Sequence, residues 1–267
     1  MDYRVVCAVP GSSWHPMCGL SVVGMTAYFA VNRLPDAKLQ TLSFQSVRGS
    51  LLPQIRYEAV KKAQAVGATH LLFVDSDQSF PPDTFHRLVK HRKPVVACNV
   101  ATKTFPSLPT ARSFSKRDPK GGVIYTYPYD KGLHKVWRIG MGLMLIDMKI
   151  FKFLDKPWFG MRWEGNEYLV GEDWWFCERV EAAKFDIFID QGLSNEVRHW
   201  SGETGFGHEM CLAELIMREE VEDAPRKGRE VQGEDELGWD EDAVGVQGEG
   251  GRRGEVGAQE EKEEEGE

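Results

Sequence analysis

Two carboxylates separated by one small residue, Asp75 and Asp77, directly follow an apolar run at residues 71–74. A short run of Leu, Phe and Val is typical of a strand that is buried on both faces. Because an isolated carboxylate is costly to bury, we expect both acids at the carboxyl end of that strand, where open α/β sheets place their ligand crevice. Residues i and i+2 of an extended chain point to the same side. Both carboxylates could therefore face one cation, and oxygen ligands suit Mg²⁺ or Mn²⁺.

This interpretation has a simpler alternative, since an Asp-x-Asp taken alone is more often a polar strand end followed by a turn. A second acidic pair, Glu172 and Asp173, opens a segment at residues 171–182 that is predicted to be a helix. Acids in a first turn are common because they complement the helix dipole. Gly140 and Gly142 precede an apolar strand rather than follow one, so they do not form a dinucleotide-binding loop. Glycines in that place allow a ligand or another backbone to come close.

Alternating strands and helices must position these acids. The helix expected at residues 49–66 has Ser50 available as N-cap, Pro53 tolerated in its first turn and Gly67 as its stop. It lies between two strands, which predicts a parallel crossover. Apolar periodicity predicts the other elements. We expect strands at residues 4–9, 39–47, 71–74, 94–100 and 185–190, and one that follows Gly142 and runs to residue 147. Short antiparallel strands are expected at 123–127 and 135–139, and helices at 20–31, 84–91, 171–182 and 208–217.

The first predicted strand ends in Pro10, Gly11, Ser12 and Ser13. Small polar residues at the carboxyl end of a strand suit a loop that lets a ligand approach the backbone closely. An ordinary strand-to-helix turn explains the same residues equally well. Both interpretations stay open at the level of the sequence.

Charge divides the 267-residue chain into two parts. Residues 1–218 carry 22 acidic and 27 basic side chains, a net charge of +5, whereas residues 219–267 carry 19 and 6, a net charge of −13. A mildly basic body suits an anionic small ligand such as a nucleotide, and the excess is too weak to indicate a nucleic-acid partner. The acidic end has too few apolar residues to offset chain entropy, so we expect it to be disordered.

Cysteine usage and the N-terminus bear on the compartment. The five cysteines form neither a C-x-x-C pair nor a zinc-binding spacing, which fits a reducing environment. The chain enters a strand-like run at once, so we expect no signal peptide. No apolar stretch has the length needed to span a bilayer. We therefore expect a cytoplasmic protein without a membrane span.

The order of these segments resembles that of the GT-A glycosyltransferases, particularly the family-2-like enzymes of bacteria and phages. The resemblance covers about residues 3–217. The motifs that carry it are V-V-C-A-V-P at 5–10, R-Y-E-A-V-K-K-A at 56–63, H-L-L-F-V-D-S-D at 70–77, G-M-G-L-M-L-I-D at 140–147, G-E-D-W-W-F-C-E-R at 171–179 and R-H-W at 198–200. It implies one Rossmann-like α/β domain of the nucleotide-diphospho-sugar transferase type at residues 1–217, with a mostly parallel central sheet flanked by helices. A disordered acidic Gly/Glu-rich tail would follow at residues 218–267.

The resemblance also implies a nucleotide-diphosphate sugar as donor and Mn²⁺ or Mg²⁺ as cofactor. Asp77 would bind the ion that bridges the donor phosphates, with His199 as a ligand from the loop after the last strand. Asp75 would contact the ribose or the metal. Arg56 would lie near the nucleotide, because a guanidinium suits a phosphate or a uracil edge. The donor would further contact Pro10, Ser13 and Ser76. The asparagine that usually follows this arginine is Tyr57 here, which leaves its role unfilled.

The implied reaction is transfer of a sugar to a hydroxyl of a glycan, protein or small molecule. Asp173 would be the base, with Glu172 as the fallback, and the family favours a single-displacement, inverting route. Aromatic faces stack on sugar rings, which makes candidates of Trp137, Trp163, Trp174 and Trp175. Adjacent helical positions do not share a face, so at least one of Trp174 and Trp175 is expected in the core.

Two other functions stay open. A nucleotidyltransferase of similar architecture also places acids at a strand end, but it usually has a basic, Gly-rich loop after the first strand, and residues 10–14 lack the basic residue. A non-catalytic nucleotide-sugar-binding module would lack the acidic pair at 172–173, and the pair is present. His208 competes with His199 as the functional histidine, although its His-Glu pattern lacks a second histidine for a zinc site.

Overall fold

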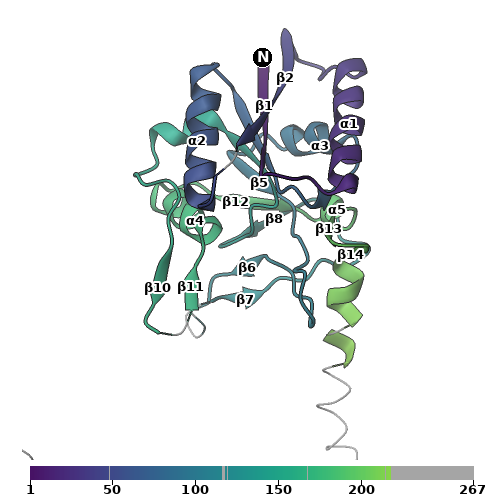
Figure 1. The fold of residues 1–267 in the computed structure, drawn as a ribbon, viewed down its shortest axis with the longest axis vertical. Coiled ribbons are helices and arrows are strands. Elements are labelled where there is room, and N and C mark those ends of the chain that lie inside the picture. The colour runs from purple at the N-terminus through teal and green to yellow at the C-terminus, as the bar shows by residue number, and fades with distance from the viewer. Residues whose placement is uncertain (48, 116–117, 119, 167, 214, 218–267) are drawn as a thin grey trace, which may run out of the picture. The chain divides into compact units, whose positions relative to one another are not determined.

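A seven-stranded sheet forms the centre of the fold in the computed structural model, which describes residues 1–47, 49–115, 118, 120–166, 168–213 and 215–217 (Figure 1). Its strand order is β2-β1-β3-β9-β5-β12-β8. Five strands run in the same direction, while β9 and β8 run against their neighbours. The bounds are β1 Asp2–Pro10, β2 Leu39–Val47, β3 His70–Val74, β5 Val95–Ala97, β8 Leu133–Val136, β9 Leu143–Asp147 and β12 Ile187–Asp190.

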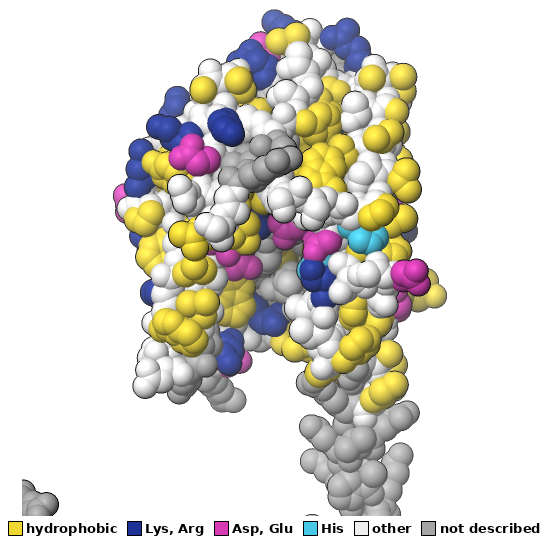
Figure 2. Space-filling view, in the orientation of Figure 1, with side chains coloured by type: hydrophobic (Ala, Val, Ile, Leu, Met, Phe, Trp, Pro, Cys, Tyr) yellow, Lys and Arg dark blue, Asp and Glu magenta, His cyan; other side chains and the backbone are white. Residues whose placement is uncertain are grey.

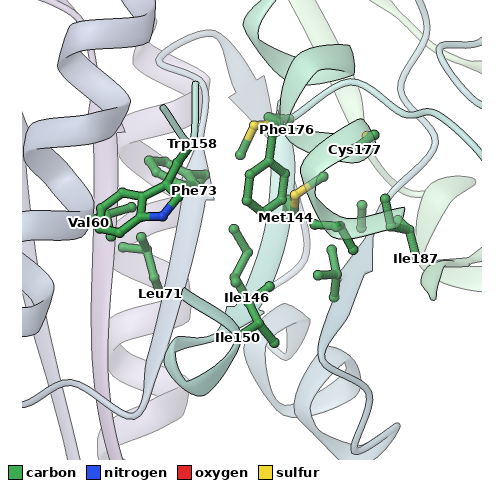
Figure 3. Packing of buried hydrophobic residues seen from close by; sticks show 14 of the residues in the cluster. Val60, Leu71, Phe73, Met144, Ile146, Ile150, Trp158, Phe176, Cys177 and Ile187 are labelled. Carbon is green, nitrogen blue, oxygen red and sulfur yellow. The ribbon is translucent and has the colours of Figure 1, made fainter. Parts of the chain in front are cut away.

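Helices cover both faces of this sheet, which is why its inner strands are continuously apolar. Leu71 and Phe73 of β3 pack with residues of α2 (Leu52–Ala65) and α4 (Glu172–Ala182), a cluster seen from close by in Figure 3. Leu72 and Val74 point to the other face, where they pack with α1 (Pro16–Val31) and α3 (Thr84–Lys90). The predicted fold class, an α/β domain with a mostly parallel central sheet flanked by helices, is confirmed.

Smaller elements surround the carboxyl ends of the parallel strands. One three-stranded sheet pairs β4 (Gln78–Ser79) with β13 (Arg198–Ser201) and β14 (Thr204–Phe206). Two hairpins, β6–β7 and β10–β11, lie in the lower half of Figure 1. Neither pairing was predicted, although β7 overlaps the short strand expected at 123–127. The bounds are β6 Arg112–Ser113, β7 Gly122–Val123, β10 Arg162–Glu164 and β11 Tyr168–Val170. A 3-10 helix, η1 (Met148–Lys152), and α5 (Gln191–Ser194) complete the named elements. Residues 208–213 and 215–217 are also helical.

Several predicted boundaries were wrong for local reasons. Helix α1 begins at Pro16 rather than residue 20, because the His15 Nδ1 accepts a hydrogen bond from the Met17 backbone N–H at 3.2 Å and caps the helix. Helix α2 begins at Leu52 with Leu51 as N-cap, so Ser50 is not the cap, although Pro53 lies in the first turn as expected. The short strands expected at 123–127 and 135–139 are formed at Gly122–Val123 and Leu133–Val136. The predicted tail, residues 218–267, lies outside the described residues.

Two further observations concern the environment of the chain. Within the described ranges, no helix combines the length and the apolar character that crossing a membrane requires. All five cysteine side chains are buried and carry free thiols. Burial raises the pKa of the Cys18 thiol to about 11, so it is protonated at neutral pH. The thiols therefore behave as small core side chains.

Candidate active site

The segment from Asp75 to Asp77 lies at the carboxyl end of β3 and is held by three distant parts of the chain. The Asp75 backbone N–H donates to the Gly142 carbonyl at 2.8 Å. The His15 N–H donates to the carbonyl of Ser76, and the Trp200 N–H donates to that of Asp77, each at 2.8 Å. Loops that precede β9 and α1, together with strand β13, therefore converge on the Asp-x-Asp motif. In the space-filling view, acidic, basic and histidine side chains gather in a hollow on this face (Figure 2).

Arg56 joins the two acidic pairs that the sequence singles out. Its Nη2 donates to Asp75 Oδ1 at 2.9 Å, and its Nε donates to Glu172 Oε1 at 3.2 Å. The guanidinium lies over the ring of Phe73, 5.1 Å from its centroid, and the residue is only 1% exposed. Burial by itself would lower the pKa of Arg56, but the two carboxylates outweigh it and hold the pKa above its usual value. Arg56, Asp75 and Glu172 form what we call the buried network.

Asp77 has different partners, although it is only two residues away. Its Oδ1 lies 3.3 Å from His199 Nε2, and its Oδ2 forms an ion pair with the Lys103 ammonium. Burial would raise the pKa of Asp77, but the hydrogen bonds from His199 and Lys103 outweigh it and lower the pKa to about 2. Asp77, His199 and Lys103 form what we call the open cluster, since each side chain is between about a fifth and a third exposed.

The position of His199 follows from its strand. In β13, His199 pairs with Gln78 of β4, which brings the imidazole back to the Asp-x-Asp motif from more than a hundred residues later in the chain. Its Nδ1 lies 3.0 Å from the Ala101 carbonyl oxygen. A carbonyl only accepts hydrogen bonds, so Nδ1 carries a proton, and Nε2 is the nitrogen that faces Asp77. Metal-bound histidines are usually oriented by such a second hydrogen bond.

The predicted metal ligands are brought together only in part. Asp77 and His199 meet, and an imidazole with a carboxylate oxygen is a reasonable start for a Mn²⁺ site. The Asp75 carboxylate instead forms an ion pair with the Arg56 guanidinium. Among the described residues, no group of three or more His, Cys, Asp or Glu side chains is placed to hold a metal ion. An ion at Asp77 would thus need oxygens from a bound donor, as is usual for Mg²⁺ at phosphate sites. That Asp75, Asp77 and His199 together bind a metal ion remains a prediction.

Asp173 stands beside the buried network at the start of α4. Its Oδ1 accepts a hydrogen bond from the Trp174 backbone N–H at 2.7 Å. Burial and then the neighbouring Glu172 carboxylate raise the pKa of Asp173 to about 6. A carboxyl with a pKa in this range suits general base work near neutral pH. Glu172 is committed to Arg56, so the two neighbouring acids have distinct surroundings.

Gln78 was not identified from the sequence, yet it is fully buried in the site. Neither Oε1 nor Nε2 of its amide has a hydrogen-bond partner within the described part of the chain. The amide lies against Gly142, where an added Cβ would approach Gln78 Nε2 to 3.1 Å and Asp75 Oδ2 to 3.5 Å. The sequence predicted that a ligand or another backbone comes close here, and the structure places the side chains of Gln78 and Asp75 against this glycine. A buried amide without partners is costly, which marks Gln78 as a group that a ligand could satisfy.

The loop after β1 reaches the same place. Pro10 is the last residue of β1 and is buried, whereas Ser13 is exposed. Between them, Gly11 has a φ of +129°, a conformation that favours glycine, and a Cβ there would come 3.1 Å from Ser76 Oγ. Pro10, Ser13 and Ser76 thus belong to one rim of the site, and their contact with a nucleotide stays a prediction.

The tryptophans differ from expectation. Neither Trp174 nor Trp175 is fully buried, so the prediction that one of them belongs to the core was wrong. The Trp175 indole donates to the Pro157 carbonyl at 2.9 Å and lies near two guanidiniums, Arg162 and Arg179. Cation–π contacts with these two guanidiniums therefore hold the Trp175 ring outside the core. Trp163, at the β10–β11 hairpin, is 65% exposed.

His208, the competing histidine, is not part of the site. It is 2% exposed, and its Nε2 lies 2.7 Å from the carbonyl oxygen of Asn99. Burial lowers the pKa of His208, so the ring is neutral at physiological pH. The contact holds the residues after β5, and of the two histidines His199 is the one that lies beside Asp77. Lys103 was also missed, because it is one of several basic residues in a loop-rich stretch whose spacing does not distinguish it.

Comparison with known proteins bears only on the fold. No protein-family model matches the chain, and no curated protein matches it either. The crystal structure of A197 from STIV is similar, with a TM-score of 0.53 and 14% sequence identity over 78% of this chain and 91% of that chain. The structure of S. aureus TarS 1–349 in complex with UDP-GlcNAc has a TM-score of 0.40 and 11% identity over 77% of this chain and 60% of that chain. The first likeness shows a shared fold, and the second is too low to support an argument.

Proposed function

We propose that this protein is a glycosyltransferase that moves a sugar from a nucleotide-diphosphate sugar to an acceptor hydroxyl. The observation that carries the proposal is the meeting of Asp77 and His199 at 3.3 Å, at the carboxyl end of a central strand. This edge of an α/β sheet is where such folds bind their ligands. The sequence resemblance anticipated both residues at this place, and their contact supports it.

The open cluster would receive the donor diphosphate. Asp77 and His199 would hold Mn²⁺ or Mg²⁺, and the phosphate oxygens would complete the coordination. A bound divalent ion would stabilise the charge that develops on the leaving diphosphate. Lys103 would give up its contact with Asp77 and turn its ammonium toward the phosphates. The loop that carries Lys103 is closed by hydrogen bonds between Thr102 and Leu108, which keep the ammonium close to the site.

The buried network would hold the nucleotide and the base. Arg56 orients Asp75, whose second oxygen would contact the ribose, and the Pro10–Ser13 rim would lie against the nucleotide. The buried amide of Gln78 would find partners on the bound donor. Asp173 would remove the proton from the acceptor hydroxyl, which would then attack the anomeric carbon in a single displacement that inverts its configuration.

A donor screen tests the proposal directly. The full chain is incubated with Mn²⁺, a panel of UDP-, GDP- and dTDP-sugars and a mixture of sugar acceptors, and products are followed by mass spectrometry. We expect metal-dependent loss of one donor, and no turnover by Asp173→Asn. Turnover of a nucleoside triphosphate with a sugar phosphate would instead identify a nucleotidyltransferase. Tight donor binding without turnover, equal in the wild type and in Asp173→Asn, would identify a binding module.

A further inference from the structure

One partly buried arginine, Arg112, has no acidic partner in the described part of the chain. It is the first residue of β6, and it forms none of the ion pairs found among the described residues. Most other described arginines do form such pairs, and these are Arg4, Arg56, Arg87, Arg92, Arg138, Arg162 and Arg198. Arginine keeps its proton at physiological pH. Arg112 is therefore a permanent positive charge that is partly withdrawn from water without compensation.

The Arg112 guanidinium is held on one side and free on the other. Its Nη1 donates to the carbonyl oxygens of Pro109 and Ala111, the second at 2.9 Å. Its Nε and Nη2 form no hydrogen bond within the described residues, and neither atom is enclosed. These two nitrogens make up the edge of a guanidinium that binds a carboxylate or a phosphate through two parallel hydrogen bonds. The protein thus fixes the orientation of the side chain and leaves its anion-binding edge open.

A chain of contacts joins Arg112 to the open cluster. Pro109, whose carbonyl accepts from Arg112, is bridged to Ala101. The Ala101 carbonyl oxygen in turn lies 3.0 Å from Nδ1 of His199. This path leaves His199 by the nitrogen that is turned away from Asp77. Arg112 therefore lies next to the open cluster without being part of it.

The surroundings of Arg112 are basic. Residues 102–122 contain five Lys or Arg side chains and a single acid, Asp118. Burial lowers the pKa of Arg112, and the nearby Asp118 and Tyr125 offset this only in part. In Figure 1, β6 and β7 are drawn below the central sheet, between the β10–β11 hairpin and β14. An anion that reaches this part of the molecule is attracted by several positive charges, of which Arg112 has the free fork.

Arginines that stabilise this fold are satisfied in other ways. Arg162 uses Nη1 and Nη2 on the Glu178 carboxylate and Nε on Glu164, so all three of its nitrogens are occupied. Arg179 forms no ion pair with the described residues, but its guanidinium lies 5.0 Å from the centroid of the Trp175 ring. Within the described chain, Arg112 has neither a carboxylate nor an aromatic ring over it. A role in stability alone does not explain its free edge.

We propose that Arg112 binds a phosphate or carboxylate group of the acceptor, so that the acceptor is an anionic sugar or glycan. This inference rests on the proposed function, because it names the class of the second substrate of that reaction. The donor diphosphate is assigned to Asp77 and Lys103, which leaves Arg112 for the acceptor. A neutral sugar excludes water from Arg112 without supplying a counter-charge, and a site of this kind discriminates strongly against such an analogue.

Binding is measured first, on the full chain without donor, by saturation-transfer NMR titration. The probes are glucose 6-phosphate, glucuronate and glucose, which share a sugar ring and differ in charge. We expect both anions to bind at least about tenfold more tightly than glucose. The tighter of the two identifies the group as a phosphate or a carboxylate.

Three variants test whether Arg112 is the source of this preference. Arg112→Met should abolish it, and Arg112→Lys should keep part of it, because an ammonium retains the charge but not the fork. Arg33→Met is the matched control, since Arg33 is exposed, donates only to the Lys38 carbonyl and lies at the other end of α1 from the site. It should keep the preference of the wild type. Circular dichroism establishes that each variant is folded.

Two binding results would overturn the proposal. One is equal affinity of the wild type for glucose and for both anions. The other is a preference for anions that survives in folded Arg112→Met and is lost in Lys103→Met, which would place the anion in the open cluster.

Transfer is then measured with the donor found in the screen. The Michaelis constant for an anionic acceptor should rise at least about tenfold in Arg112→Met, while that for the donor stays unchanged. Transfer to neutral sugars with no preference for anionic ones would refute the acceptor assignment and leave the proposed function standing. An anion preference that depends on Arg112, without transfer to any acceptor, would refute the proposed function and leave only the anion site.

Discussion

Asp75 and Asp77 are two residues apart, yet they belong to environments that differ in kind. Asp75 is part of the buried network, in which one inaccessible guanidinium satisfies two carboxylates. Asp77 is part of the open cluster, in which an imidazole and an ammonium approach from a strand and a loop far along the chain. The buried network is preorganised and costly to disturb. The open cluster is partly solvated and can exchange partners, as the proposed site for a metal and a diphosphate would require.

Removing the centre of the buried network should have the largest effect. Arg56→Met leaves Asp75 and Glu172 without their shared cation, and breaking a buried pair in this way costs about 3–5 kcal/mol. We expect a fall of about 3 kcal/mol in the free energy of unfolding, measured by urea denaturation. Arg92→Met is the control, because its ion pair with Asp36 is exposed and such pairs contribute less than about 1 kcal/mol. Equal losses in both variants would show that the network does not differ from a surface pair.

Asp173→Asn, beside the buried network, should reduce the rate of sugar transfer and change how stability depends on pH. Loss of the base should reduce sugar transfer by about 10²-fold or more. The pKa of Asp173 is raised to about 6 in the folded chain, so the folded state holds its proton more tightly than the unfolded state. Stability should therefore fall as pH rises from about 4 to about 6, and Asp173→Asn should remove this loss.

Thermal melts at pH 4 and pH 7 measure this second effect. Relative to the wild type, Asp173→Asn should be more stable at pH 7 than it is at pH 4. A variant that is destabilised equally at both values, or that keeps its transfer rate, would contradict the role assigned to Asp173. Transfer by the wild type should decline as pH falls below about 6, because the base is then protonated.

In the open cluster, Asp77→Ala should remove donor binding while the fold survives. We expect at least about a tenfold weaker affinity for the donor in Mn²⁺, measured by calorimetry, because the carboxylate that would hold the ion is gone. The loss of stability should be smaller than in Arg56→Met, since the partners of Asp77 remain partly solvated. Asp186→Ala, which removes an exposed carboxylate paired with Lys135, is the control. Donor affinity like that of the wild type in Asp77→Ala would remove the open cluster from the site.

The smallest effect concerns Lys103 and is a gain. Lys103→Met removes the ammonium that competes for Asp77, so Mn²⁺ in the absence of donor should bind several-fold more tightly. Calorimetric titration of Mn²⁺ measures this change, and Lys61→Met, on the exposed side of α2, should leave the affinity unchanged. Weaker binding of Mn²⁺ by Lys103→Met would show that the ammonium does not compete with the ion.

The sequence alone located the parts whose chemistry is local. A run of apolar residues that ends in acids has one stable place in an α/β fold, at the end of a buried strand, and Asp75 and Asp77 are found there. Acids in a helical first turn and an arginine beside an apolar stripe are equally local patterns, and they placed Glu172, Asp173 and Arg56 on α4 and α2. These predictions depend on residues within a few positions of one another.

Only the tertiary structure decided which of these groups meet. That Arg56 joins Asp75 to Glu172, that Lys103 takes one oxygen of Asp77, and that β9 runs antiparallel between β3 and β5 depends on contacts between segments far apart in the chain. The free edge of Arg112 is of the same kind, because the residues around it in the sequence do not show which carboxylates lie near it in the fold. Packing determines which residues far apart in the sequence contact each other, and the local sequence pattern does not specify these contacts.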